Sequence, residues 1–246
     1  MELVIQQTAR DAANMCANII GSAIREKPEI VLGLATGRTM EPLYAALAER
    51  HRRQGLDFAG CVAFALDEYV GLGPAHEQSY SYYLQRHLFD QVGISPDQIR
   101  LLDGLAPDLD AEAQRYEQEI TARGGIDLQL VGMGNNGHIG FNEPGSSFGS
   151  RTRPVPLTPE TIAQNAEVFG NPAKVPSYAI TMGVATILEA GRCVMLVTGS
   201  AKAGILARAM ESSPTTEITA SALQLHPDCL VIADKAAASS LRQRAG

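Results

Sequence analysis

Short apolar runs alternate with amphipathic segments along most of the chain. Apolar runs bounded by turn residues predict buried strands, which we place at residues 30–35, 61–66, 126–132, 178–181, 193–197 and 229–233. Between them, apolar positions with helical periodicity predict helices at residues 41–54, 79–90, 108–123, 182–190, 201–211 and 235–244. The glycine pair at 124–125 is typical of a helix end.

This alternation predicts the fold class. Strands that are apolar on both faces are covered by helices on both sides, as in parallel sheets. We therefore expect an α/β fold with a doubly wound, mostly parallel open sheet of the Rossmann-like kind and helices on both faces. A chain of 246 residues suits one such domain, so we expect residues 1–246 to form a single domain.

One segment interrupts the alternation. Residues 151–176 contain five prolines and a partly polar helical pattern. A long insertion in a compact domain is often a lid over a binding site, and we expect a lid-like insertion here. A plain excursion over the surface is the alternative that the sequence leaves open.

Composition and charge argue against several classes of partner and indicate where the protein acts. The chain carries 20 Lys and Arg against 27 Asp and Glu, a net charge of −7, and it has no long basic run. We therefore expect no nucleic-acid partner, since such proteins present a basic surface. No apolar run is long enough for a bilayer and the first residues lack the pattern of a secretion signal, so we expect a cytoplasmic protein without a membrane partner. The four cysteines show no CxxC spacing, which indicates reduced thiols in the core.

Ligands of open α/β sheets bind beyond the carboxyl ends of the strands, so the residues that follow each strand are the candidates. The first such junction has the sequence GLATGRT, residues 33–39. A Thr- and Gly-rich turn that opens a helix presents free backbone N–H groups, which favour a phosphate. Thr36, Gly37, Arg38 and Thr39 are the candidate phosphate-binding residues. A purely structural turn remains the alternative.

Two carboxylates follow the next strand. Asp67 and Glu68 stand at the end of the apolar run FAL. A carboxylate beside apolar walls is a candidate general base. The alternative for Asp67 is that it caps the following turn.

The third junction is the most concentrated polar cluster of the chain. The sequence VGMGNNGHIGFNEP, residues 131–144, supplies Asn136, His138, Asn142 and Glu143 among several glycines. Histidine with a carboxylate that fixes its tautomer forms a general acid/base pair. Because His138 and Glu143 provide only two ligands, we predict no metal site. A structural role for His138 remains the alternative.

These segments together resemble one family. The strings FALDEYVGL, HEQSYSYYLQRHLFDQVGI and GMGNNGHIGFNEPGSSFGSRTR resemble the glucosamine-6-phosphate deaminase (isomerase) family, as do LATGRT, ITMGVATILEA, LVTGSAKA and SALQLHPD. The resemblance runs from about residue 31 to residue 234. The 6-phosphogluconolactonases share the fold but generally lack the LDEYVGL and GHIGFNEP strings.

The resemblance implies a reaction and assigns roles. In that family, glucosamine 6-phosphate and water give fructose 6-phosphate and ammonia, by a hydrolase of a C–N bond with an isomerase step and no cofactor. Asp67 matches the residue that carries a proton between C2 and C1. His138 matches the residue that opens the pyranose ring, and Asn136 and Glu143 match its supporting partners. Many members have Asp at the position of Asn136, whereas others have Asn.

The phosphate site departs from the family pattern. Lys202 matches a cation that the family uses for the sugar phosphate. Many members have Arg where this chain has Glu167, and Gly or Ser where it has Arg38. We hypothesise that Arg38 supplies the missing cation and that Glu167 points away or pairs with it. The alternative is that Arg38 faces solvent.

The resemblance also bears on regulation. Arg153 matches one contact to an allosteric activator, but Val155 replaces a basic contact and the chain ends at Gly246 without the extension of longer members. We therefore expect no activation by N-acetylglucosamine 6-phosphate, and a monomer or small homo-oligomer.

Other functions stay open at this point. A 6-phosphogluconolactonase-like enzyme would leave Asp67 without a task, and a galactosamine-6-phosphate isomerase would differ only in a hydroxyl contact. A non-catalytic sugar-phosphate sensor usually follows a DNA-binding helical module, which we do not find before the first predicted strand.

Overall fold

The computed structural model describes residues 1–242. Its large sheet has seven strands in the order β1-β10-β9-β6-β2-β3-β5, and each neighbouring pair is parallel. The strands are β1 (Glu2–Gln6), β2 (Val31–Leu34), β3 (Val62–Ala65), β5 (Ile99–Arg100), β6 (Leu128–Val131), β9 (Arg192–Val197) and β10 (Cys229–Asp234). This arrangement confirms the predicted parallel α/β sheet.

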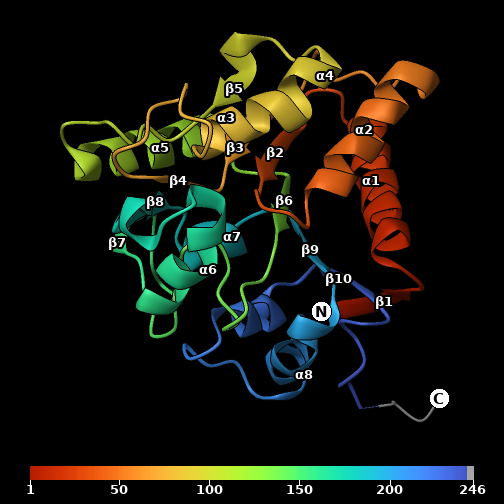
Figure 1. The fold of residues 1–246 in the computed structure, drawn as a ribbon. Coiled ribbons are helices and arrows are strands. Elements are labelled where there is room, and N and C mark those ends of the chain that lie inside the picture. Colours follow the sequence, from red (N-terminus) through yellow and green to blue (C-terminus); the bar gives the residue numbers. More distant parts are fainter. Residues whose placement is uncertain (243–246) are drawn as a thin grey trace.

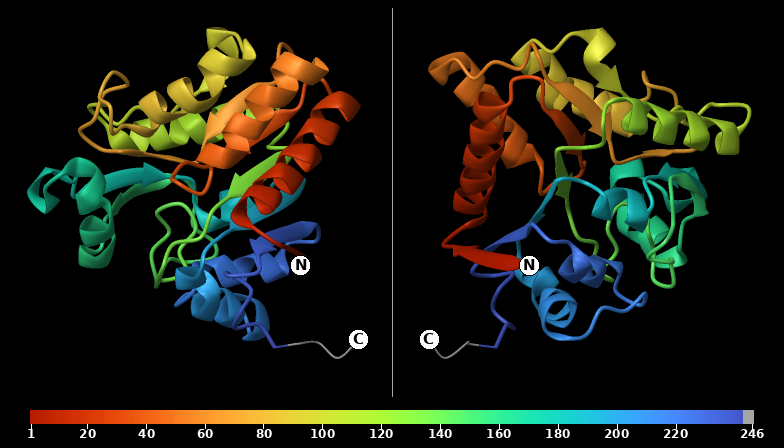
Figure 2. Two further views of the ribbon diagram at one scale, coloured as in Figure 1. Left: turned by 45° about the vertical axis from the view of Figure 1, so that its right-hand side comes forward. Right: turned by 180° about the vertical axis from the view of Figure 1, so that it is seen from behind.

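Helices cover the sheet from both sides. Helices α1 and α2 lie side by side on one face, and α5 lies on the other (Figures 1 and 2). The helices of this layer system are α1 (Ala9–Glu26), α2 (Glu41–Gln54), α3 (Tyr80–Leu84), α4 (Asp90–Val92), α5 (Leu109–Ala122), α7 (Val184–Leu188) and α8 (Ala203–Glu211). A π-helical stretch at Gln85–Phe89 joins α3 to α4, so the helix predicted at 79–90 is present in three parts. Short 3-10 helices lie at Pro96–Gln98, Ser200–Lys202 and Thr219–Leu225.

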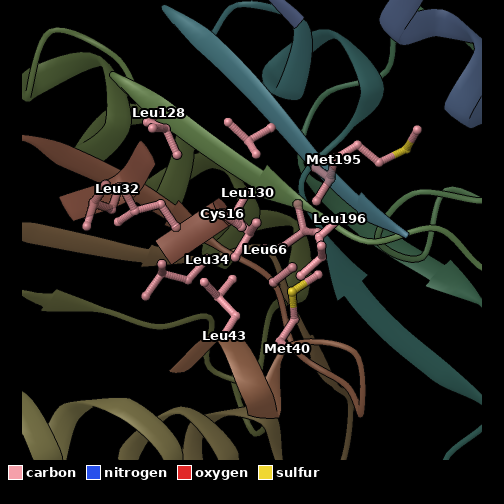
Figure 3. Packing of buried hydrophobic residues seen from close by; sticks show 14 of the residues in the cluster. Cys16, Leu32, Leu34, Met40, Leu43, Leu66, Leu128, Leu130, Met195 and Leu196 are labelled. Atoms are coloured by element: carbon pink, nitrogen blue, oxygen red, sulfur yellow. The ribbon is translucent and has the colours of Figure 1, made fainter. Parts of the chain in front are cut away.

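The main core lies on both faces of the large sheet, under α1 and α2 on one side and under α5 on the other. The cluster includes leucines of β2 and β6, Cys16 of α1, and Met195 and Leu196 of β9, whose side chains point to opposite faces of the sheet (Figure 3). Burial of apolar side chains on this scale is the main source of stability of such a domain. Met40 belongs to this core and also reaches the pocket described below, so the core supports one wall of the site.

A second, antiparallel sheet stands beside the large one. It has the order β4-β8-β7, from β4 (Asp67–Tyr69), β8 (Tyr178–Thr181) and β7 (Arg153–Pro156). The chain passes from β3 into β4 with only Leu66 between them. The strand predicted at 178–181 is therefore present, but it pairs in this smaller sheet and not in the parallel one.

The insertion at 151–176 is largely regular. After β7 it forms helix α6 (Pro159–Phe169) and a 3-10 helix at Pro172–Lys174. A small core of Tyr69, Phe141, Val155, Leu157 and Ala179 joins the insertion to the second sheet, with Phe169 of α6 packed against it. The ring centroids of Tyr69 and Phe169 lie 5.5 Å apart. The insertion and the second sheet project together from one side of the large sheet (Figure 2).

Three sequence-based predictions of helices and strands need correction. Residues 235–241 form successive turns and not a helix, because the Asp234 carboxylate accepts the Ala237 N–H and the following bonds are mainly of the tighter 3-10 type. The rest of that predicted helix, from residue 243, lies outside the described residues. Helix α7 begins only at Val184, after Gly183, whose backbone presses against Ser150. The prediction also omitted β1 and α1.

The four cysteines lie in the core, as the sequence indicated. Cys16, Cys61, Cys193 and Cys229 are all free and buried, which confirms core thiols. In residues 1–242, no helix combines the length and the apolar character needed to cross a membrane.

Candidate active site

The strand order of the large sheet reverses between β2 and β6. Strands β3 and β5 continue beyond β2, whereas β9 and β10 continue beyond β6. The carboxyl ends of parallel strands at such a reversal leave a crevice that binds ligands. A pocket of about 210 Å³ lies here, and its walls include Thr36–Thr39, Asp67, His138 and Lys202. The structure thus brings together predicted residues that follow β2, β3, β6 and β9.

Asp67 projects into this pocket from the start of β4. The side chain is only 5% exposed, and its Oδ1 has no hydrogen-bond partner among residues 1–242. Burial, and then the nearby charge of Glu68, raise the pKa of Asp67 well above its usual value. A buried carboxylate with a free oxygen and a raised pKa is suited to take and return a proton.

Both oxygens of Glu68, the neighbouring carboxylate, accept hydrogen bonds from within the fold. Its Oε1 accepts the N–H groups of Tyr69 at 2.9 Å and Tyr80 at 2.8 Å, and its Oε2 accepts the N–H and hydroxyl of Ser81 at 2.8 and 2.7 Å. Glu68 therefore anchors the first turn of α3. Successive strand residues point to opposite faces, so only Asp67 reaches the pocket. The structure therefore distinguishes the two neighbouring carboxylates: Asp67 faces the pocket, and Glu68 is bonded within the fold.

His138 and Glu143 form the pair that the sequence predicted. The Nδ1 of His138 lies 3.2 Å from Oε2 of Glu143, and the Nδ2 of Asn136 donates to the same oxygen at 2.9 Å. The Asn136 Oδ1 in turn accepts the backbone N–H of His138 at 3.1 Å. This arrangement orients the imidazole ring and directs its other nitrogen away from Glu143.

The protonation of Glu143 follows from its partners. Burial alone would raise the pKa of Glu143, but hydrogen bonds from His138, Thr161 and Asn136 and the charge of His138 lower it to about 2. Glu143 is therefore an anion at neutral pH, which suits it to support an imidazolium.

Glycines leave room for the imidazole. A Cβ on Gly134 would lie 2.3 Å from Nε2 of His138, so no other residue fits beneath the ring. Gly137 adopts a φ of 88°, which favours glycine, in the turn that returns the chain to His138. The cluster of glycines at this junction therefore shapes the pocket around one side chain.

The turn after β2 is held from outside the pocket. Gly37 has a φ of 101°, and its carbonyl accepts the Met40 N–H at 2.8 Å and the Tyr83 hydroxyl at 2.9 Å. The backbone of Thr36–Thr39 thus lines the pocket at the start of α2.

Two positively charged side chains lie at that turn: Arg38 within it, and Lys202 from the segment after β9. Burial, and then the charge of Arg38, lower the pKa of Lys202 to about 8. Arg38 lines the pocket mouth, and its Nη1 lies 3.4 Å from Oε2 of Glu167. Of the two arrangements foreseen for Glu167, the structure therefore has the ion pair with Arg38. Glu167 is a single negative charge beside these two positive side chains. A bound phosphate would supply the negative charge that is lacking there.

Helix α6 supplies pocket residues that the sequence analysis missed. Thr161, Gln164 and Asn165 line the pocket from one face of the helix. The signal was present: Thr158 caps the helix, Pro159 opens it, and polar residues recur at helical spacing. What the sequence could not show is which face turns toward the strand ends.

Arg153 is placed away from the pocket. Its Nη1 donates to Oδ1 of Asn142 at 2.9 Å and its Nη2 to Oγ of Ser146 at 3.2 Å, while Val155 lies in the small core. Arg153 thus ties β7 to the segment beside Glu143.

Within residues 1–242, no group of three or more His, Cys, Asp and Glu side chains is placed to hold a metal ion. The side chains of Asp67 and His138 in the pocket can transfer protons, and those of Arg38 and Lys202 can bind an anion.

Comparison with known proteins matches this chain to one family. The family model described as glucosamine-6-phosphate isomerases/6-phosphogluconolactonase matches residues 5–231. A glucosamine-6-phosphate deaminase of Geobacillus sp. is 46% identical over 97% of this chain and 95% of its own. One of Arthrobacter sp. is 46% identical over 98% of this chain and 93% of its own.

Solved structures agree. The structure of a monomeric glucosamine-6-phosphate deaminase superposes with a TM-score of 0.96 at 41% identity, over 98% of this chain and 100% of that one. A 6-phosphogluconolactonase of Trypanosoma brucei has a TM-score of 0.77 at 17% identity over 98% of both chains, a likeness of fold alone.

Proposed function

Since this chain belongs to the family of glucosamine-6-phosphate isomerases and 6-phosphogluconolactonases, we propose that it acts as a glucosamine-6-phosphate deaminase. It converts glucosamine 6-phosphate and water into fructose 6-phosphate and ammonia. The observation that carries the proposal is the pocket itself, where Asp67, a buried carboxylate with a free oxygen, and His138, whose ring is bonded to Glu143, line one space. Full-length relatives named as deaminases support it.

The first step is opening of the sugar ring. His138 moves a proton from the C1 hydroxyl to the ring oxygen, so that the C1–O5 bond breaks and an aldehyde forms at C1. Glu143 and Asn136 support the imidazole during this transfer, because an adjacent carboxylate stabilises the imidazolium. Ring opening creates the acidic C2–H on which the next step depends.

Asp67 then moves a proton between two carbons. Its carboxylate takes the proton from C2 while a proton of the substrate's ammonium group moves to O1, which gives an enolamine. It then returns its proton to C1, which leaves an iminium group at C2. Water adds to C2 and ammonia leaves, so the product carries a ketone there. Because the pKa of Asp67 is raised, it lies closer to the pKa of the C2–H group from which the carboxylate takes the proton.

The phosphate site is the turn after β2 with its two cations. We assign the backbone of Thr36–Thr39, Lys202 and Arg38 to the phosphate. A guanidinium grips phosphate oxygens in a bidentate manner. Because Glu167 lies 3.4 Å from Arg38, the phosphate competes with Glu167 for that guanidinium.

Further properties belong to the same proposal. The enzyme is a hydrolase of a C–N bond with an isomerase step, and it needs no cofactor. It acts in the cytoplasm as a monomer without nucleic-acid or membrane partners, which is supported by its four free thiols and by its likeness to a monomeric deaminase. The insertion at 151–176 serves as a lid, since its helix α6 lines the pocket.

Ammonia release from glucosamine 6-phosphate by the purified chain, with a chelator present, tests the proposal. We expect ammonia and fructose 6-phosphate in equal amounts. Galactosamine 6-phosphate and 6-phosphogluconolactone are the comparison substrates. Turnover of either one in preference to glucosamine 6-phosphate would overturn the assignment, and binding without turnover of any would indicate a sensor.

A further inference from the structure

We propose that Thr161 is a positioning residue that couples helix α6 to the His138–Glu143 pair. Contacts of α6 with the sugar thereby decide whether Glu143 is held in place to support His138. The inference rests on the proposed function and extends it to a residue outside the motifs of the strand ends.

The two oxygens of Glu143 have separate sources of hydrogen bonds. Oε2 is bonded within its own loop, by Asn136 and His138. Oε1 accepts the hydroxyl hydrogen of Thr161, which comes from α6. A buried carboxylate is costly unless its oxygens are bonded. One of the three hydrogen bonds to this carboxylate therefore depends on where α6 sits.

Thr161 is fixed within α6 at both ends. Its side chain is buried, its N–H donates to Oγ1 of Thr158 at 3.2 Å, and its carbonyl accepts Nδ2 of Asn165 at 2.9 Å. Asn165 and Gln164 lie one turn further along the helix and line the pocket. A sugar hydroxyl that binds either amide acts on the same turn of helix that carries Thr161.

The remainder of α6 is attached by weaker means. Ile162 and Phe169 pack on the small core of the second sheet, and Glu167 meets Arg38 across the pocket mouth. Helix α6 lies beside β7 and β8, apart from the main core (Figure 1). A shift of α6 would take the Thr161 hydroxyl from Glu143 while the bonds within the 136–143 loop persist.

The coupling links binding to chemistry. When α6 is seated, Glu143 is bonded on both oxygens and the imidazole has one orientation. When α6 moves away, Oε1 loses its donor and the pair loosens. Ring opening by His138 is therefore favoured only while α6 covers a bound sugar, which limits exposure of the open-chain intermediate to solvent.

Two substitutions at Thr161 test this assignment. Thr161→Val keeps the shape but removes the hydroxyl, and Thr161→Ser keeps the hydroxyl but removes a methyl group. We expect T161V to lower kcat for ammonia release at least tenfold, with the Kd for inorganic phosphate within twofold of the wild-type value. We expect T161S to retain kcat within threefold. Thr161→Ala replaces T161V if that variant does not fold.

Val168→Ala is the matched control, because Val168 is an exposed residue of the same helix and its substitution leaves the packing of Ile162 and Phe169 and the bond to Glu143 in place. We expect its kcat to stay within threefold of the wild-type value. The inference is overturned if T161V keeps kcat within twofold or changes only KM. It is also overturned if T161S is as slow as T161V, or if V168A loses as much kcat as T161V does. A wild-type chain that releases no ammonia would instead refute the proposed function.

Discussion

The two sides of the pocket are built differently. At the strand ends, Asp67 and Glu143 are buried, and each is placed by the parallel sheet or by a glycine-shaped loop. At the mouth, the side chains of Arg38 and Glu167 are 78% and 77% exposed and meet at 3.4 Å. A hydrogen bond to a buried charge contributes about 1.5–3 kcal/mol, whereas an exposed ion pair contributes at most about 1 kcal/mol. The chemistry is therefore fixed by the sheet, and the mouth adjusts affinity.

The largest effect is expected at the strand ends. Asp67→Asn keeps the shape of the side chain and removes the base, so kcat for ammonia release should fall about 10²–10⁴-fold. The Kd for inorganic phosphate should stay within twofold, since the phosphate turn is intact. An activity loss below tenfold in a steady-state ammonia assay would remove Asp67 from its proposed role.

His138→Gln should act on ring opening only. We expect turnover of glucosamine 6-phosphate to fall about a hundredfold, within the range for loss of an acid/base group. An analogue that cannot cyclise should be turned over at a rate within threefold of the wild-type rate. An equal loss for both substrates, compared in parallel assays, would contradict the assignment.

Arg38→Ala tests the mouth. Loss of a bidentate contact should raise the KM for glucosamine 6-phosphate about tenfold, which corresponds to about 1.4 kcal/mol. The weak binding of unphosphorylated glucosamine should barely change. If KM is unchanged, the phosphate is held by Lys202 and the backbone of the turn alone.

We expect Lys202 to make the proposed phosphate site dependent on pH. Burial, and then the charge of Arg38, lower the pKa of Lys202 to about 8 in the free enzyme. If Lys202 holds the phosphate as proposed, it does so only when protonated, so kcat/KM should be highest below pH 8 and fall as the pH rises through about 8, by a factor on the order of ten. Lys202→Arg keeps its charge in this range. The fall should therefore disappear in K202R, and a fall of the same size would exclude Lys202 as its source.

The smallest effect is expected from Glu167→Gln. Removing the carboxylate that competes for Arg38 should lower KM two- to threefold, since an exposed pair contributes about 0.5 kcal/mol. The difference from the wild type should shrink in high salt, because exposed charges are screened. Combining it with R38A supplies the control: the double variant should match R38A, and an additive gain would show that Glu167 acts elsewhere.

The sequence predicted the strand-end side of the pocket better than the mouth. Motifs contiguous in sequence, such as residues 131–144, keep their residues together in the fold. By contrast, Thr161 lies 18 residues from Glu143, and only tertiary packing joins them. Spacing alone did not distinguish Glu68 from Asp67; the family resemblance pointed to Asp67, and alternation along the strand places the two side chains on opposite faces.

Other omissions have different causes. Helix α1 has apolar residues at helical spacing, from Ala12 to Ile24, and the periodicity was sufficient to predict it. Strand β8 is an apolar run like its parallel neighbours, so composition could not show that it pairs antiparallel in a second sheet. The turns after β10 begin where the Asp234 carboxylate accepts the N–H of Ala237, and the helix propensity of the residues does not predict such a bond.

Exchange at C2 tests the central claim most directly. Wild-type enzyme and D67N would each be incubated with glucosamine 6-phosphate in deuterated water and followed by NMR. We predict that the wild type removes the C2 proton and forms fructose 6-phosphate with ammonia, whereas D67N leaves the C2 proton signal intact over the same period. Loss of that proton at the wild-type rate in D67N would show that another group is the base.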